Sequence, residues 1–321
     1  MKDQSLLRLT QCAYQVAQRA MPSFRSKFSK KTFTQPQLLA CLILKTYLRL
    51  TYRGAEAWLQ ATDRVSRILG LKLPPDHSTL CWFFHHKLTL GLLQRLLRQS
   101  LRVGPHWPQA GVVALDSTGF WAGHSSRYYR WRCHHERGQR GWPKWAIAVA
   151  VRPQLICAQL CRAGPCGDFA DLPPLATAAH RLVRMRCVLA DAGYDSESNH
   201  CFCRQTLKVR SIIPARGHRP GSASTRYRQQ MQRRFPRRIY RQRWKVETVI
   251  SVVKRKWGDA VSARTEARQF RELWLMGVTY NLHRGAVKLL FIIVIPTVRP
   301  PPSGKDFNRA RPPNKTGCGM I

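Results

Sequence analysis

Apolar residues recur every three or four positions through the first 105 residues. The stretch QPQLLACLILKTYLRLTYRGAEAWLQ, residues 35–60, shows this spacing clearly, and it predicts helices with one buried face. The pattern is broken by Gly70 and by the pair Pro74–Pro75, which are residue types that mark turns. The first third of the chain is therefore expected to be helical.

A further helix is expected directly after this break, in the segment DHSTLCWFFHHKL. Either Asp76 or Ser78 can cap its first turn. A helix, a short turn and a capped helix in a basic context indicate a helix-turn-helix that binds DNA. An ordinary helical hairpin would give the same pattern, and the pattern alone does not separate the two.

From Gly111 the pattern changes to short apolar runs bounded by turn residues, which predicts buried strands. The order β-β-β-α-β-α-β-α predicts an α/β architecture, in which helices flank a mixed sheet. The expected strands are GVVALD, KWAIAVAVR, QLICAQLCRAG, RCVLAD and VRSIIPARG, and DLPPLATAAHRLV is expected to be a helix.

The apolar periodicity disappears between residues 216 and 238, where Gly, Ser, Pro and Arg dominate. This segment is expected to be a mobile basic loop, and a long helix is expected from Tyr240. The end of the chain is rich in proline and basic residues and is expected to be disordered. The predicted organisation is a helical region (1–105), an α/β domain (106–295) and a tail (296–321).

Net charge is the most unusual property of the composition. The chain holds 55 Lys and Arg against 16 Asp and Glu, a formal net charge of +39. Self-repulsion on this scale opposes a compact state, so a polyanionic partner such as nucleic acid is the simplest explanation. No membrane partner is expected, because the longest apolar run, Leu289–Ile295, is far shorter than the roughly 18–20 residues that span a bilayer. No signal peptide is visible either, which favours a cytoplasmic protein.

The 11 cysteines are scattered through apolar segments, which indicates buried, reduced thiols rather than a disulfide framework. His200, Cys201 and Cys203 could supply metal ligands, but no second pair of ligands lies at a useful distance in the sequence. A zinc site is therefore not favoured.

The few acidic residues occupy informative positions. Asp116 and Asp191 each follow a hydrophobic strand at its C-terminal end, where α/β sheets usually carry their chemistry. A capping or turn aspartate would look the same. Glu247 is different, because no acid occurs between Ser198 and Val246 and the surrounding helix is basic.

Helical geometry gives Glu247 a set of neighbours. At 100° per residue, Tyr240, Arg243, Glu247 and Lys254 lie within about 60° of one another on one face. An apolar stripe made by Val246, Val249, Ile250, Val253 and Trp257 lies about 95° away. The polar face therefore runs beside the core and is suited to lining a cleft, although a salt-bridged helix surface could produce the spacing by chance.

These residues match a known pattern. Tyr240-x2-Arg243-x3-Glu247-x6-Lys254 resembles the Y-x2-R-x3-E-x6-K signature of bacterial insertion-sequence transposases of the DDE type. ALDST resembles the first catalytic motif of that family, SSRYYRWR the segment after it, and LADAGYDS the second motif, D-x-G-Y. LPPDHSTLCWFFHHKL is similar to an N-terminal segment of the family. The main resemblance covers about residues 111–284 and implies a ribonuclease-H-like fold.

The resemblance also implies a metal site. Asp116 would bridge two magnesium ions, for which manganese can substitute, and Asp191 and Glu247 would each complete one metal site. Two such ions activate the attacking oxygen and stabilise the leaving oxygen in phosphodiester chemistry. Asp195, four residues after Asp191, is the alternative second ligand. Asp168, in the segment GPCGDFADL, is expected to be structural.

The neighbours of Glu247 are then expected to bind DNA. Lys254 and Arg243 would hold phosphates, and Tyr240 would bind a phosphate or pack beside a base. Trp244 and Trp257 are expected to be packing residues. The full set of expected DNA-binding residues is Tyr240, Arg243, Lys254, Lys256, Arg237 and Arg238.

The leading interpretation is a transposase that binds double-stranded DNA at the terminal inverted repeats of its own element, cleaves it and joins it to target DNA. A homodimer assembled on DNA and association with the nucleoid are expected. A nuclease on the same fold and a non-catalytic DNA-binding remnant stay open, although the intact Asp116, Asp191 and Glu247 argue against the remnant. A ribosomal or RNA-packaging protein would explain the charge but not the acids at strand ends.

Overall fold

The computed structural model describes residues 2–103, 111–122, 142–216 and 224–294. As expected, the described N-terminal residues form mainly helices. The helix expected after Pro74–Pro75 is capped by Asp76 rather than Ser78, and Asp76 accepts a hydrogen bond from Thr79 N at 2.7 Å. Thr34, Thr51 and Thr89 cap their helices in the same way. The helices are α1 (Lys2–Ala20), α2 (Gln35–Leu48), α3 (Tyr52–Gln60), α4 (Asp63–Leu69), α5 (His77–Lys87) and α6 (Leu90–Ser100).

A five-stranded sheet follows, with strand order β4-β3-β1-β5-β6. Its strands are β1 (Val112–Gly119), β3 (Pro143–Ala150), β4 (Leu155–Ala163), β5 (Cys187–Leu189) and β6 (Arg210–Ile212). The β1–β3 and β3–β4 pairs are antiparallel, whereas β1–β5 and β5–β6 are parallel. The expected strands and the mixed sheet are confirmed, and the arrangement is compatible with a ribonuclease-H-like fold. A small second sheet pairs β2 (Trp121–Ala122) with β7 (Ala260–Val261) and was not expected.

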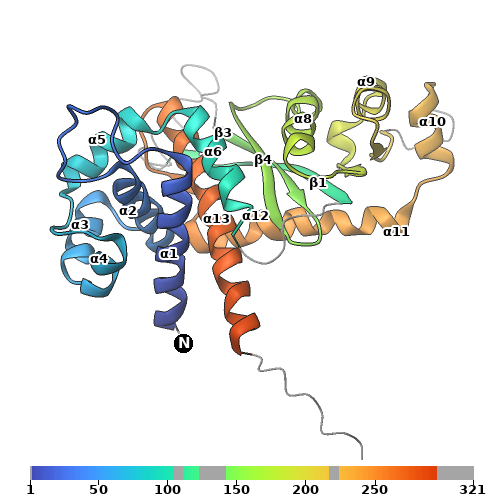
Figure 1. Cartoon of the computed structure of the whole chain (residues 1–321). Helices are drawn as coiled ribbons and strands as arrows, with labels where there is room; N and C mark the ends of the chain where they lie inside the picture. Colours follow the sequence, from blue (N-terminus) through green and yellow to red (C-terminus); the bar gives the residue numbers. More distant parts are fainter. Residues whose placement is uncertain (1, 104–110, 123–141, 217–223, 295–321) are drawn as a thin grey trace, which may run out of the picture.

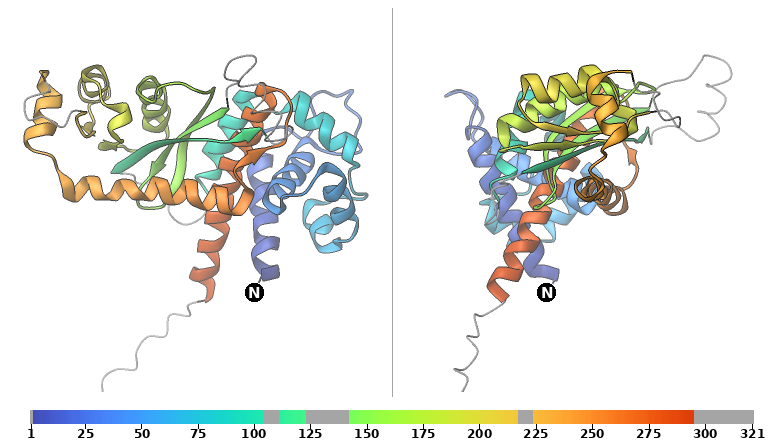
Figure 2. Two further views of the ribbon diagram at one scale, coloured as in Figure 1. Left: turned by 180° about the vertical axis from the view of Figure 1, so that it is seen from behind. Right: turned by 90° about the vertical axis from the view of Figure 1, so that its right-hand side faces the viewer.

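Helices cover both faces of this sheet, and β1 shows how its side chains divide between them. Val113 and Leu115 belong to the core shared with α8 (Leu172–Leu182), whereas Ala114 belongs to the core shared with α12 (Trp244–Trp257). Figures 1 and 2 show α8 on one side of the sheet and α12 running along the other. Because side chains alternate along a strand, Asp116 lies on the α12 face and Ser117 on the α8 face.

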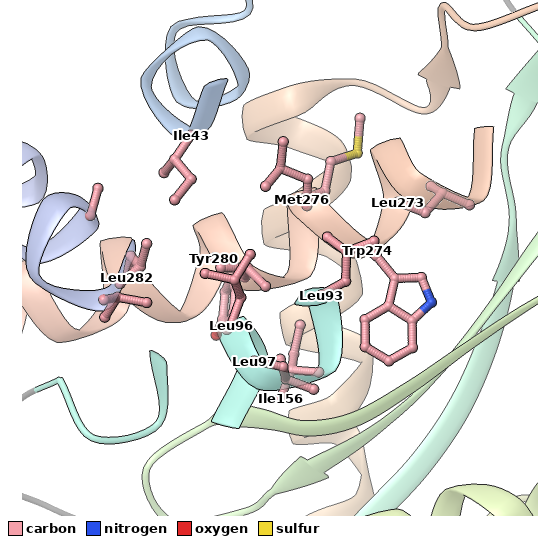
Figure 3. Close-up of a cluster of buried hydrophobic side chains, with 14 of the residues drawn as sticks. Ile43, Leu93, Leu96, Leu97, Ile156, Leu273, Trp274, Met276, Tyr280 and Leu282 are labelled. Atoms are coloured by element: carbon pink, nitrogen blue, oxygen red, sulfur yellow. The ribbon is translucent and has the colours of Figure 1, made fainter. Parts of the chain in front are cut away.

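The long helix α13 (Glu266–Val294) connects the sheet with the N-terminal helices. Figure 3 shows its apolar residues, among them Leu273 and Met276, packed with residues of α2, α6 and β4. Asn281 bonds the edge strand β4, accepting from Ile156 N and donating to Ile156 O, each at 2.8 Å. These bonds satisfy backbone groups that a free edge would leave open to another chain. The helix runs to Val294, so residues 289–294 of the longest apolar run form its end.

The expectation of a mobile loop over residues 216–238 is wrong for most of the part that the structure describes. It contains α10 (Arg226–Arg233) and α11 (Arg237–Tyr240). Glu197, on α9 (Glu197–Cys201), accepts hydrogen bonds from the backbone N–H groups of Tyr227 and Arg228 at 3.0–3.2 Å. A distant carboxylate thus anchors α10 by its first turn, which local apolar periodicity does not reveal.

The helix expected from Tyr240 is interrupted. A 3₁₀ turn, Arg241–Arg243, separates α11 from α12. On α12, the apolar stripe is buried as expected at Val246, Val249, Val253 and Trp257, with Ile250 only half-buried. The expectation that Trp244 is a packing residue is wrong, since it is 55% exposed. It lies about 160° around the helix from Val246, on the opposite side from the buried stripe.

The remaining expectations can be compared only where the structure describes the chain. Five of the nine described cysteines are buried free thiols as expected, but Cys166 is exposed. The boundary near residue 105, the segment SSRYYRWR and the tail 296–321 lie outside the described residues. Within the described part, none of the helices combines the length and apolar character needed to cross a membrane.

Candidate active site

Asp116, in the C-terminal half of β1, and Asp191, two residues beyond the end of β5, lie toward the same end of the sheet. The expectation that Asp116 ends its strand is wrong, because pairing with β3 continues β1 to Gly119. The strands β1 and β5 are parallel neighbours, and Ala114 pairs with Leu189 in their register. Each aspartate lies two residues further along its strand direction, and neighbouring strands are about 4.8 Å apart. Ala114 and Leu189 both belong to the core on the α12 side, so the alternation of side chains directs the two carboxylates toward α12.

Arg243 links the sheet to the acid on α12. Its Nη1 lies 3.7 Å from Asp116 Oδ2, and its Nη2 contacts Glu247 Oε1. The side chains of Arg243 and Asp116 are only 19% and 18% exposed, whereas that of Glu247 is 51% exposed. The guanidinium therefore lies between one largely buried acid and one that reaches solvent.

The electrostatics of Asp116 reflect this environment. The pKa of Asp116 is raised from 3.8 to about 6, mainly by burial and also by the negative charges of Asp191 and Glu247. The Ser117 N–H, 2.9 Å from Asp116 Oδ1, and the charge of Arg243 act in the opposite direction. The three acids thus share one electrostatic field, in which a nearby cation is favourable.

Asp195 has different partners from Asp191. Arg228 Nε lies 3.1 and 3.0 Å from the two carboxylate oxygens of Asp195, and Arg216 N donates to Oδ2 at 2.7 Å. The Asp195 side chain is fully buried in this pair. Asp191 instead accepts a hydrogen bond from Gly193 N at 2.9 Å and is half-buried. By pairing with Arg228 on α10, Asp195 therefore connects α10 to the turn after β5.

The expected DNA-binding residues fall into two groups. Arg237, Arg238 and Lys256 are exposed on α11 and α12, with side chains that reach solvent. Lys254 is half-buried, and its Nζ donates to Gly119 O at 3.0 Å, at the end of β1. Burial lowers the pKa of Lys254.

Tyr240 also has partners within the protein. It is half-buried, and its ring packs against Phe235 with ring centres 4.8 Å apart. The Arg243 guanidinium lies 6.0 Å from the Tyr240 ring centre. Tyr240, Arg243 and Glu247 are thus neighbours despite the 3₁₀ turn, whereas Lys254 contacts β1 three residues beyond Asp116, at Gly119.

Comparison with known proteins assigns this arrangement to a family. Residues 107–282 match the family model of the transposase DDE domain, which is more than half of the 321 residues. The chain belongs to the DDE transposase family. An uncharacterised protein of Aquifex aeolicus (strain VF5) is also similar, with 28% identity over 260 residues that make up 76% of this chain and 75% of that protein.

The donor chemistry of this transposase domain fits a divalent cation. Carboxylate oxygens are the ligands that magnesium prefers, and Asp116, Asp191 and Glu247 share one field. Among the described residues, however, no three His, Cys, Asp or Glu side chains are grouped as a metal cluster. Arg243 supplies the positive charge between Asp116 and Glu247 in this arrangement.

The zinc site considered from the sequence, made of His200, Cys201 and Cys203, does not form a metal cluster in the described part of the transposase either. His200 is buried, and its Nδ1 lies 2.7 Å from Ser211 Oγ. Burial lowers the pKa of His200 to about 4. Cys203 is buried in the core with the apolar residues of α8. His200 and Cys203 therefore contribute to the packing of this part of the fold.

Sequence reasoning missed a polar group on the other face of the sheet. Ser117 Oγ donates to Asp168 Oδ1 at 2.6 Å, and Lys144 Nζ lies 2.7 Å from the same oxygen. A lysine in the otherwise apolar strand PKWAIAVA was the available signal, because a buried ammonium requires partners. Its partner Asp168 lies 24 positions later in the sequence, beyond the reach of local patterns.

Proposed function

We propose that this transposase cleaves DNA at the ends of a mobile element and joins those ends to target DNA. The observation that carries the proposal is the β1–β5 register, which sets Asp116 beside Asp191 on the face that α12 covers. Glu247 is connected to this pair because Arg243 contacts both Asp116 and Glu247. The partners of Asp195 favour Asp191 as the second carboxylate.

Asp116, Asp191 and Glu247 would hold the divalent ions. Bound magnesium, or manganese in its place, would supply activation of the attacking oxygen and stabilisation of the leaving oxygen. The protein's own residues would position the DNA. Arg243 is suited to bind a backbone phosphate once its contacts with Asp116 and Glu247 are relaxed, because a guanidinium matches phosphate geometry.

The surface around Glu247 supports DNA as the partner. Arg237, Arg238 and Lys256 add exposed positive charge along α11 and α12. Trp244 offers an exposed ring one turn before Glu247, and aromatic rings of this kind stack on unpaired bases. Lys254 would act indirectly, by holding the end of β1 through Gly119.

A second DNA surface is proposed on the N-terminal helices. Trp82 on α5 is 52% exposed, with the His86 ring stacked 5.0 Å away and the Lys87 ammonium 5.0 Å from its centre. Trp82 and Lys87 line a groove of about 490 Å³ together with Arg25 and Lys30. The positive charges and the exposed aromatic ring of this groove favour DNA as its ligand.

The helix-turn-helix interpretation needs one adjustment. α4 ends at Leu69 and α5 begins at His77, which leaves residues 70–76 between them. This connection is longer than the three or four residues of a usual helix-turn-helix turn. The proposal for end binding therefore rests on the exposed face of α5 and not on that motif. Action on chromosomal DNA by a dimer assembled there would place the protein with the nucleoid in the cytoplasm.

The test uses purified full-length protein, end-labelled DNA carrying the terminal repeats of its own element, a target plasmid and Mg²⁺. We expect strand breaks at the element ends and joined products, and we expect neither with Asp116→Asn or with EDTA. Breaks without joined products would favour a nuclease. End binding without breaks by the wild type would favour a non-catalytic remnant.

A further inference from the structure

Lys144 lies in the centre of a buried ionic group on the α8 face of the sheet. Its side chain is 7% exposed, and its Nζ donates to Cys166 O at 3.1 Å and to Gly167 O at 3.2 Å. It also lies 2.7 Å from Asp168 Oδ1 and 2.8 Å from Asp171 Oδ2. Four oxygens therefore surround this ammonium, which compensates for its removal from water.

The two aspartates of this group have different additional partners. Asp171 is 1% exposed and pairs with Arg162 Nε at 2.7 Å, on the neighbouring strand β4. Asp168 accepts a second hydrogen bond, from Ser117 Oγ at 2.6 Å. Asp171 therefore belongs to the packing of the sheet, whereas Asp168 reaches the residue that follows Asp116.

Asp168 also reaches the turn after β5. A methyl group on Gly193 would lie 3.0 Å from Asp168 Oδ2 and 2.9 Å from Asp191 Oδ1. The turn can approach these two carboxylates so closely because Gly193 has no side chain. Asp168 thus contacts both segments that carry the candidate carboxylates, by a hydrogen bond at Ser117 on β1 and by close packing at Gly193 after β5.

We propose that Asp168, held in place by Lys144, is a positioning residue for the carboxylate site. On the α8 face Asp168 holds the Ser117 side chain by a hydrogen bond and restricts the position of the turn at Gly193. In this way it sets the direction and spacing of the Asp116 and Asp191 carboxylates on the α12 face. This inference rests on the proposed metal-dependent function, since it concerns how the two acids are arranged before a cation binds. Asp168 itself is not a metal ligand in this account.

Direct Mn²⁺ binding to the full-length protein without DNA provides the readout, by calorimetry or electron paramagnetic resonance, together with the thermal midpoint of each variant. Ser117→Ala and Asp168→Ala should weaken Mn²⁺ binding by about tenfold or more, as loss of groups that orient metal ligands does. Ser117→Thr retains the hydroxyl and should bind Mn²⁺ like the wild type. Arg162→Gln, which removes the ion pair with Asp171, should not change Mn²⁺ affinity even if it lowers the midpoint.

The outcomes separate this inference from the proposed function. If Asp116→Asn abolishes wild-type Mn²⁺ binding but folded Ser117→Ala and Asp168→Ala bind Mn²⁺ normally, the positioning role is overturned and the metal site stands. If Asp168→Ala does not fold, Ser117→Ala decides the question alone. If Mn²⁺ binds equally to the wild type and Asp116→Asn, the proposed metal site is wrong and this inference is overturned with it.

Discussion

The guanidinium of Arg243 lies beside the carboxylate of Asp116, with its Nη1 3.7 Å from Asp116 Oδ2. Its other terminal nitrogen contacts Glu247, so one side chain balances two of the acids that the proposed function assigns to metal binding. A divalent cation and this guanidinium would both be stabilised by the same carboxylates. Two opposite effects of removing Arg243 follow from this competition.

Arg243→Met should increase the affinity of the DNA-free protein for Mn²⁺, by about tenfold at the dielectric typical of a protein surface, because a competing positive charge is removed. Cleavage of element-end DNA should fall, since a phosphate-binding group is also lost. The matched variant is Arg255→Met on the same helix, whose exposed side chain bonds Ser251 O of its own turn. Equal Mn²⁺ affinity in wild type, Arg243→Met and Arg255→Met would refute the competition.

Asp116→Asn should change how stability depends on pH. The pKa of Asp116 is about 6 in the folded protein and near the ordinary value of 3.8 in the unfolded chain, so the folded form retains a proton between these values that the unfolded form releases. Metal-free wild type should therefore lose stability as the pH rises through this window, whereas the amide variant does not. At pH 7 the variant should be more stable by roughly 1–3 kcal/mol.

Urea unfolding of both proteins in EDTA at pH 3.5, 5 and 7 measures this difference. The gap should be small at pH 3.5 and largest at pH 7. A constant gap across the three pH values would mean that burial does not raise the pKa of Asp116.

Lys254→Met should destabilise the protein, although its sequence position suggests a DNA contact. The ammonium of Lys254 donates to Gly119 O at 3.0 Å, and hydrogen bonds of charged groups typically contribute about 1.5–3 kcal/mol. Lys256→Met, two residues later on an exposed face, should leave the free energy of unfolding within about 0.5 kcal/mol of wild type. Chemical denaturation compares the two, and equal stabilities would show that the Lys254 bond contributes nothing.

Lys87→Gln tests the N-terminal surface. Binding should weaken for DNA of any sequence, and the slope of log affinity against log salt concentration should decrease by about one, as expected when one phosphate contact is lost. Lys208→Gln, on an exposed turn before β6, provides a control for a lysine outside the proposed surfaces. Fluorescence anisotropy at several salt concentrations gives both slopes, and an unchanged slope for Lys87→Gln would exclude this face from DNA contact.

The parts of this fold that sequence predicted are those with local signals. Apolar runs gave the strands, and the period-two alternation of β1 accounts for the face of the sheet on which Asp116 lies. The parts that sequence missed depend on partners far apart in the chain. α10 depends on Glu197. The exposure of Trp244 is a different case, because it follows from the place of Trp244 on its own helix, opposite the buried stripe.

The candidate site divides in the same way. Asp116 and Asp191 could be selected because each ends an apolar run, and Glu247 because it is isolated in a basic helix. Their association depends on the pairing of β1 with β5 and on Arg243, which no spacing reveals. Lys144 and Asp168 were outside any motif for catalysis, and only the fold shows that Lys144 and Ser117 both contact Asp168 Oδ1.

The central claim is that Glu247 binds a catalytic cation, and Glu247→Gln tests it most directly. The change keeps the size of a side chain that is 51% exposed, so an ordinary surface glutamate would tolerate it within about 0.5 kcal/mol of stability and without loss of activity. The decisive measurement compares binding and Mg²⁺-dependent cleavage of element-end DNA by folded Glu247→Gln and wild type. We predict that the variant binds the DNA at least as tightly but that cleavage and joining fall by orders of magnitude, since metal ions contribute several kcal/mol to the transition state. Cleavage near the wild-type rate by Glu247→Gln would contradict the three-carboxylate mechanism.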